Sequence, residues 1–198
     1  RMYRLYRIAT RLSAKTILNK RLAKDKEDAK RIGERMGQSK LKRPEGALLW
    51  VHGASVGEVT SLLTLVQRLQ AQNKDLSVLI TSGTKTSADI IKNRALPNLI
   101  HQYIPMDHPS WVTRFLDHWR PDAVIFAESE IWPNLISEIG ARKIPSALIN
   151  ARMSDKSYKG WKRFGKTIAK LLRSFDVVLT QSIEDKRRYV ELGHSHVK

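Results

Sequence analysis

The sequence has 198 residues and no cysteine, so disulfide bonds and cysteine-ligated metals are excluded. It contains no run of about 18 apolar residues that could span a membrane, and no secretory signal peptide is visible. The formal net charge of +17 is unusual, and a charge of that sign attracts nucleic acid, anionic lipid or phosphorylated substrates. Charge alone does not choose among these partners.

Residues 1–45 form a basic segment, in which residues 1–43 hold fifteen Lys or Arg against four acids. Within 2–18, apolar side chains recur every three or four positions and basic ones lie on the other side, which predicts an amphipathic helix. Such a helix is typical of a membrane interface, but packing on its own domain with a solvated basic face suits it equally. Residues 19–45 lack a strong period and are expected to be helix and linker. The apolar positions are Met2, Leu5, Tyr6, Ala9 and Leu12.

From residue 46 onward, predicted strands alternate with predicted helices. Largely apolar, β-branched strands in this alternation indicate a doubly wound α/β fold, with a parallel sheet and right-handed crossovers. We expect strands at 47–52, 76–81, 99–104, 123–127, 145–149 and 176–180, and helices at 58–71, 85–95, 110–118, 132–141, 158–173 and 183–192.

The C-terminal part of the chain contains a second basic cluster and two histidines. Helix 158–173 combines this cluster with an apolar stripe that we expect to lie in the core. His194 and His196 lack zinc-site spacing and are expected to be exposed near a frayed end. Residues 196–198 have the pattern of a strand that is about to begin, which leads us to expect a further domain beyond this chain.

Small and polar residues follow the predicted strands, at the edge where parallel sheets bind ligands. The sequence His-Gly-Ala-Ser-Val-Gly-Glu at 52–58 forms a strand–turn–helix junction, which presents backbone N–H groups to a ligand and makes Glu58 a candidate general base. The helix dipole alone also favours an acid at that position. Glu128 and Glu130 alternate at the fourth strand's end, so one can face the site while the other caps the next helix. A metal held by this pair is only a weak possibility.

Two other classes of function remain open from the residues alone. Residues 53–57 match the G-x-S-x-G elbow of serine hydrolases, with Ser55 as nucleophile, but no earlier strand can supply the usual second oxyanion donor. The net charge would suit a nucleic-acid-binding protein, but the sequence lacks interleaved aromatic residues and any recognised motif of that class.

Six short motifs, in this order and spacing, resemble the N-terminal half of the lipopolysaccharide Kdo transferases, where Kdo is 3-deoxy-D-manno-octulosonic acid. The resemblance implies a GT-B glycosyltransferase with two Rossmann-like domains. Residues 46–198 would then be the acceptor-binding domain, 1–45 a membrane-proximal helical segment, and the donor-binding domain would be absent from this chain. The motifs are Glu34–Gly37, His52–Glu58, Thr81–Ser87, Tyr103–Asp107, Glu128–Leu135 and Asn150–Ser154.

The resemblance also implies a reaction, in which Kdo passes from CMP-Kdo to a lipid A precursor, a bisphosphorylated and acylated glucosamine disaccharide. It assigns Glu58 as the general base and Glu128 to transition-state stabilisation. CMP-Kdo would bind the missing domain, so we expect this chain alone to be inactive. We expect the acceptor site to be lined by Ser55, Gly57, Thr84, Asn150 and Arg152.

The resemblance implies no metal, no cofactor and no nucleic acid as partner. It also implies that the protein lies at the cytoplasmic face of the bacterial inner membrane, bound peripherally or anchored by its N-terminal segment. Helices 2–18 and 158–173 would contact this surface by charge and modest apolar insertion.

Overall fold

The computed structural model describes residues 2–128 and 131–198. Within these ranges, six parallel strands form one sheet with the order β3-β2-β1-β4-β5-β6, so the predicted doubly wound α/β fold is confirmed. The strands are β1 Leu48–Gly53, β2 Ser77–Ser82, β3 Leu99–Tyr103, β4 Ala123–Ala127, β5 Ser146–Ala151 and β6 Val177–Thr180.

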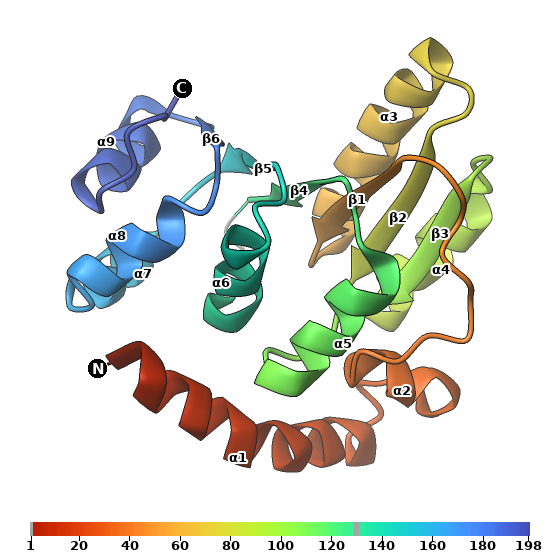
Figure 1. Ribbon diagram of the computed structural model, residues 1–198, viewed down its shortest axis with the longest axis horizontal. Helices are drawn as coiled ribbons and strands as arrows, with labels where there is room; N and C mark the ends of the chain where they lie inside the picture. Colours follow the sequence, from red (N-terminus) through yellow and green to blue (C-terminus); the bar gives the residue numbers. More distant parts are fainter. Residues whose placement is uncertain (1, 129–130) are drawn as a thin grey trace.

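Helices cover both faces of this sheet (Figure 1). Helices α3 (Val56–Gln72) and α4 (Lys85–Arg94) connect β1, β2 and β3 in turn and pack with them in one apolar cluster. Helices α5 (Pro109–Trp119), α6 (Pro133–Ala141) and α8 (Lys166–Leu172) pack in a second cluster against the other face, joined by α9 (Ile183–Glu191). The chain thus changes direction and face between β3 and β4, and the two halves of the sheet meet where β1 and β4 are neighbours.

The helix predicted at 158–173 is wrong in one respect, because the segment forms two helices. Helix α7 (Asp155–Lys162) ends before Gly165, which has a φ of +46°, and α8 begins at Lys166. A positive φ interrupts the right-handed helical path, and glycine adopts it without the steric cost of a Cβ. Ile168 and Leu172 are buried as the apolar stripe predicted, while Trp161 and Phe164 are half-buried.

The prediction for His194 is also wrong. Its side chain is only 2% exposed, its Nε2 lies 2.8 Å from the Phe175 carbonyl, and its Nδ1 accepts the His196 amide. This buried position arises because Val197 pairs in parallel with Val178 of β6, which draws the preceding residues onto the domain. His196 is exposed, and residues 196–198 form one isolated parallel bridge to β6 rather than a strand.

Helix α1 (Met2–Ala23) lies across the outside of the α5–α6 layer, at the bottom of Figure 1. Its domain-facing side buries Ala14 and Leu18, and Tyr6 donates a hydrogen bond to Asp107. The apolar side chains of Leu5 and Leu12 are 63% and 74% exposed. No helix among the described residues is long and apolar enough to cross a membrane.

The segment between α1 and β1 packs through buried polar contacts and contains a 3₁₀ turn (Ala29–Arg31) and α2 (Ile32–Arg35). Glu34 accepts the Tyr103 amide at 2.8 Å. Gly37 has a φ of +75°, and a Cβ there would lie 2.1 Å from the Trp111 carbonyl oxygen. The Glu34–Gly37 motif therefore joins the N-terminal segment to β3 and α5.

Candidate functional site

The candidate site lies at the switch point between β1 and β4. These strands are parallel neighbours, with His52 opposite Phe126, but the helices that follow them cover opposite faces of the sheet. In open α/β sheets the diverging loops at such a point leave a crevice outside the carboxyl ends of the strands, where ligands bind. Glu58 follows β1 and Glu128 follows β4, so the two candidate carboxylates lie on the two strands of this switch point.

The β1–α3 junction holds Glu58 through a capping box. Ser55 is the N-cap of α3 and accepts the Glu58 amide, while the Glu58 carboxylate accepts the Ala54 amide at 2.7 Å and the Ser55 hydroxyl at 3.0 Å. The Ser55 hydroxyl satisfies an N–H group that a helix start leaves unpaired, and the carboxylate reaches one residue beyond the usual capping box, to the amide before the N-cap. Gly53 permits the close approach, because a Cβ there would lie 3.0 Å from the Val59 nitrogen.

Glu58 therefore has a structural role whatever its chemistry. Glu58 is 8% exposed. Each of its carboxylate oxygens accepts one hydrogen bond and keeps a second lone pair. A substrate hydroxyl could donate to that lone pair. Ser55 and Gly57 are exposed at the mouth of the junction, and Gly57 has open space where a Cβ would lie.

The loop after β2 contacts the loop after β1. Thr84 is the N-cap of α4, accepts the Ser87 amide and donates to the Ser87 hydroxyl at 2.7 Å. A Cβ on Gly83 would lie 3.4 Å from the Ala54 carbonyl oxygen, so the two helix starts are side by side. Two such starts direct several backbone N–H groups and positive dipole ends to one region. Thr84 is exposed there.

The loops after β4 and β5 bring Glu128 and Arg152 together. The Arg152 Nε lies 3.1 Å from the Glu128 Oε2, and the Glu128 amide donates to the Ile149 carbonyl. Glu128 and Asn150 have φ values of +62° and +51°, which is uncommon for residues with a side chain and is found often at functional sites. The Glu130 half of the predicted carboxylate pair, with Ser129, lies outside the described residues.

The predicted site residues thus fall into two groups on neighbouring strands. The first group follows β1 and β2, and the second follows β4 and β5. Comparison with known proteins gives this arrangement a context: the family described as 3-deoxy-D-manno-octulosonic-acid transferase (kdotransferase) matches residues 30–198.

The chain belongs to the Kdo transferase family. It is 38% identical to a 3-deoxy-D-manno-octulosonic acid transferase of Rickettsia bellii, over 89% of this chain and 42% of that protein. A probable mitochondrial transferase of Arabidopsis thaliana is 38% identical over 81% of this chain and 36% of its own length. The corresponding values for the Haemophilus influenzae enzyme are 33%, 85% and 40%. The chain therefore spans less than half the length of these relatives.

Asp107 is a buried residue of the Kdo transferase motifs whose role the sequence reasoning missed. Its carboxylate accepts the amides of Asn134 and Leu135, both at 2.9 Å, and the Tyr6 hydroxyl at 2.8 Å. Burial raises the pKa of Asp107, although these three hydrogen bonds act in the opposite direction. Asp107 therefore caps α6, which begins just after the Glu128 loop, and ties α1 to the same point.

Two residues of α9 hold the loop that carries Arg152, and these were missed as well. Asp185 accepts the Met153 amide at 2.8 Å, and Arg188 donates to the Met153 carbonyl and pairs with Asp155. The only local signal is the capping pattern Ser182-x-x-Asp185, because the partner loop lies about 30 residues earlier in the sequence.

Two observations bear on the metal and nucleophile alternatives. Within the described residues, no group of three His, Cys, Asp or Glu side chains could hold a metal ion. Ser55 is engaged as an N-cap and donates to Glu58. In a serine hydrolase that hydroxyl would instead donate to a histidine base.

Proposed function

We propose that this chain is the acceptor-binding half of a metal-independent GT-B Kdo transferase, which acts on a lipid A precursor with CMP-Kdo as donor. Residues 46–198 would form the acceptor domain and 1–45 a membrane-proximal segment, and the donor would bind a second domain. The observation that carries the proposal is the position of Glu58 and Glu128 on either side of the switch point in a chain of this family.

In the proposed reaction, the acceptor hydroxyl attacks the anomeric carbon of Kdo. A new carbon–oxygen bond forms, the bond to the CMP phosphate breaks, and Glu58 takes the hydroxyl proton. General-base catalysis of this kind contributes about 10²–10⁴-fold in rate. Glu128 stabilises positive charge that develops on the sugar, as carboxylates do in glycoside hydrolysis. Arg152 holds the Glu128 carboxylate in place through the 3.1 Å ion pair.

The proposed acceptor is a membrane lipid, and the surface of α1 supports a peripheral contact with the cytoplasmic leaflet of the inner membrane. Leu5, Ile8 and Leu12 are more than half exposed on one side of the helix. Arg4, Arg11 and Lys15 are exposed beside this stripe. Each basic residue near an anionic bilayer contributes about 1 kcal/mol, so several together with the apolar stripe would suffice for peripheral binding.

A binding experiment with the purified chain tests this proposal. The chain is titrated with a bisphosphorylated lipid A precursor in mixed micelles and, separately, with CMP-Kdo. In the control micelles, phosphatidylglycerol replaces the precursor and supplies the same total negative charge. Preferential binding of the precursor, without binding of CMP-Kdo, would support an acceptor half. Equal binding to both kinds of micelle would contradict an acceptor site within this chain.

A further inference from the structure

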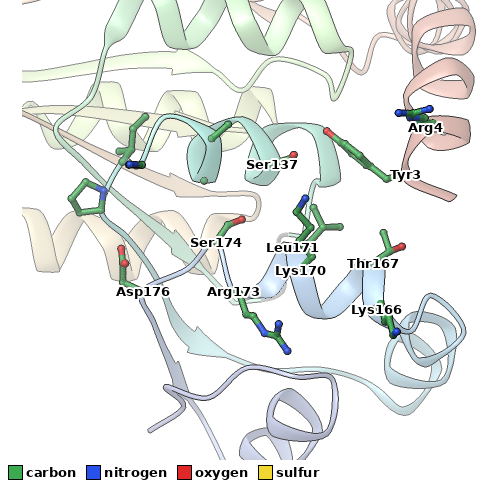
Figure 2. Close-up of a pocket in the computed structure, with 15 residues that line it drawn as sticks. Tyr3, Arg4, Ser137, Lys166, Thr167, Lys170, Leu171, Arg173, Ser174 and Asp176 are labelled. Carbon is green, nitrogen blue, oxygen red and sulfur yellow. The ribbon is translucent and has the colours of Figure 1, made fainter. Parts of the chain in front are cut away.

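Two cavities adjoin beneath the N-terminal end of α1, away from the switch point between β1 and β4. An apolar cavity of about 510 Å³ lies between α1, the start of α6, α7 and α8. A cationic cavity of about 940 Å³ lies between α1, the C-terminal end of α6 and α8 (Figure 2). Tyr3, Thr167 and Leu171 line both, so the two cavities are direct neighbours, and we call the pair the cleft.

The apolar cavity is walled mainly by rings and aliphatic side chains. Trp161 and Phe164, whose ring centroids are 5.5 Å apart, line it together with Tyr6 and Ile168. Its volume falls within the range of about 300–1,000 Å³ that is typical of small-molecule sites. A hydrocarbon chain would gain apolar contact there, and each methylene that it buries tightens binding by about fourfold.

The cationic cavity is lined by five basic side chains and by one acidic side chain, that of Asp176. In Figure 2, Arg4 comes from α1, and Lys166, Lys170 and Arg173 come from α8 and its C-terminal end. Apart from Arg173, which donates to the Gly193 carbonyl, none forms an ion pair or hydrogen bond with another described residue. Unpaired like charges in one concave surface favour an anion. The five are Arg4, Lys143, Lys166, Lys170 and Arg173.

We propose that this cleft binds one anionic membrane phospholipid, with an acyl chain in the apolar cavity and its phosphate in the cationic cavity. An anionic phospholipid fits this site because a lipid-sized apolar cavity lies next to a cluster of cations that have no ion-pair partner among the described residues. Both cavities lie under a helix that exposes an apolar stripe. The site goes beyond the proposed transferase reaction and uses none of its residues.

The position of the cations distinguishes this lipid from the acceptor. Pro145 and Asp176, which precede β5 and β6, line the cationic cavity, whereas Glu128 follows β4 at the opposite edge of the sheet. A six-residue strand spans about 20 Å, so a phosphate in this cavity would lie roughly that far from the candidate catalytic carboxylates. The bound phosphate therefore belongs to a lipid of the surrounding bilayer rather than to the reacting sugar.

The test measures one-to-one binding of monomeric short-chain phosphatidylglycerol to the 198-residue chain by titration calorimetry, below the micelle concentration. Gly160→Phe is the blocking variant, because Gly160 lines the apolar cavity and a Cβ there meets no atom within 4 Å. Replacing a helical glycine also favours the helix, so the melting temperature should not fall. We expect binding to weaken more than tenfold, since excluding two methylenes costs about fourfold each.

A pair of charge variants separates the phosphate site from the general positive field. Lys166→Gln with Lys170→Gln should weaken binding by about fivefold for each lysine. Lys159→Gln with Lys186→Gln makes the same change of net charge at exposed positions outside both cavities and should leave binding unchanged. Equal weakening by both pairs, or full binding by Gly160→Phe, would overturn the proposal. Displacement of the phospholipid by lipid A precursor would assign the cleft to the acceptor and would overturn it as well.

Discussion

Glu58 both caps α3 and is the proposed base, and a single substitution can separate these roles. In Glu58→Gln, the side-chain oxygen can accept the Ala54 amide, which lies 2.7 Å from Oε2. The new NH₂ group can donate to the Ser55 hydroxyl, which lies 3.0 Å from Oε1. Glutamine therefore keeps the geometry of the cap but cannot take a proton at neutral pH.

The expected loss of stability for Glu58→Gln is small. A charge-assisted hydrogen bond becomes a neutral one and a favourable interaction with the helix dipole is lost, which together cost about 1 kcal/mol. Domains of this kind are stable by about 5–15 kcal/mol, so the variant stays folded. Loss of the base should lower kcat at least about 100-fold. Turnover is assayed in a protein that joins this chain to the donor-binding domain, and stability by urea unfolding of the chain.

Asp28→Ala provides a control for this experiment. Asp28 caps the 3₁₀ turn Ala29–Arg31, where its carboxylate accepts the Lys30 amide at 2.9 Å, so its loss also costs about 1 kcal/mol, but in the segment before β1 and outside the switch point. This variant should retain turnover. If Glu58→Gln loses less than tenfold in kcat, Glu58 is not the base and its role is that of the cap alone.

Three further predictions concern stability and are measured by urea unfolding. Arg31 only donates, so Nδ1 of His101 must be the acceptor of their 3.0 Å contact; burial and this cation lower the pKa of His101 to about 3. Because the unfolded histidine takes up a proton below about pH 6.5, stability should fall by about 1–2 kcal/mol between pH 7 and pH 5. His101→Gln should reduce this pH dependence, and an unchanged slope would refute the assignment. Asp107→Asn places an NH₂ group against a buried helix amide and should cost about 2–3 kcal/mol; a loss below about 1 kcal/mol would show that Asp107 is not the cap it resembles. Gly37→Ala should cost more than 3 kcal/mol, because the added Cβ would lie 2.1 Å from a carbonyl oxygen at a positive φ, and a near-neutral result would contradict the close packing against α5.

The sheet could be predicted from the sequence because its signal is local. Buried parallel strands read as short apolar runs between turn residues, and each predicted strand lies within two residues of an observed one. The break between α7 and α8 could not be predicted in the same way. Trp161, Phe164, Ile168 and Leu171 keep a helical spacing across it, so the period of the apolar residues continues while the backbone changes direction at Gly165.

The candidate site was predictable only in part, for a related reason. Glu58 and Glu128 follow strands directly, and strand order alone places such residues on one edge. Asp107 and Asp185 instead bind backbone amides, of the start of α6 and of the loop after β5, that lie 27 and 32 residues away in the sequence. A backbone N–H group has no sequence signature, so the partner of a buried carboxylate of this kind becomes visible only when the chain is folded.

Helix α1 has an arrangement of polarity that bears on the proposed membrane contact. On its domain-facing side, the Tyr6 hydroxyl and the Thr10 hydroxyl bond to Asp107 and Asn134, while Leu5 and Leu12 point outward. A helix that served only to cover its own domain would bury its large aliphatic residues and expose its hydroxyls. The N-terminal half of α1 has the reverse order, whereas Leu18 further along is buried, and exposure of Leu5 and Leu12 costs little if the outer face meets hydrocarbon. Asp107 also caps α6 just after the Glu128 loop. This one buried carboxylate would therefore connect the part of α1 that contacts a bilayer to the proposed site.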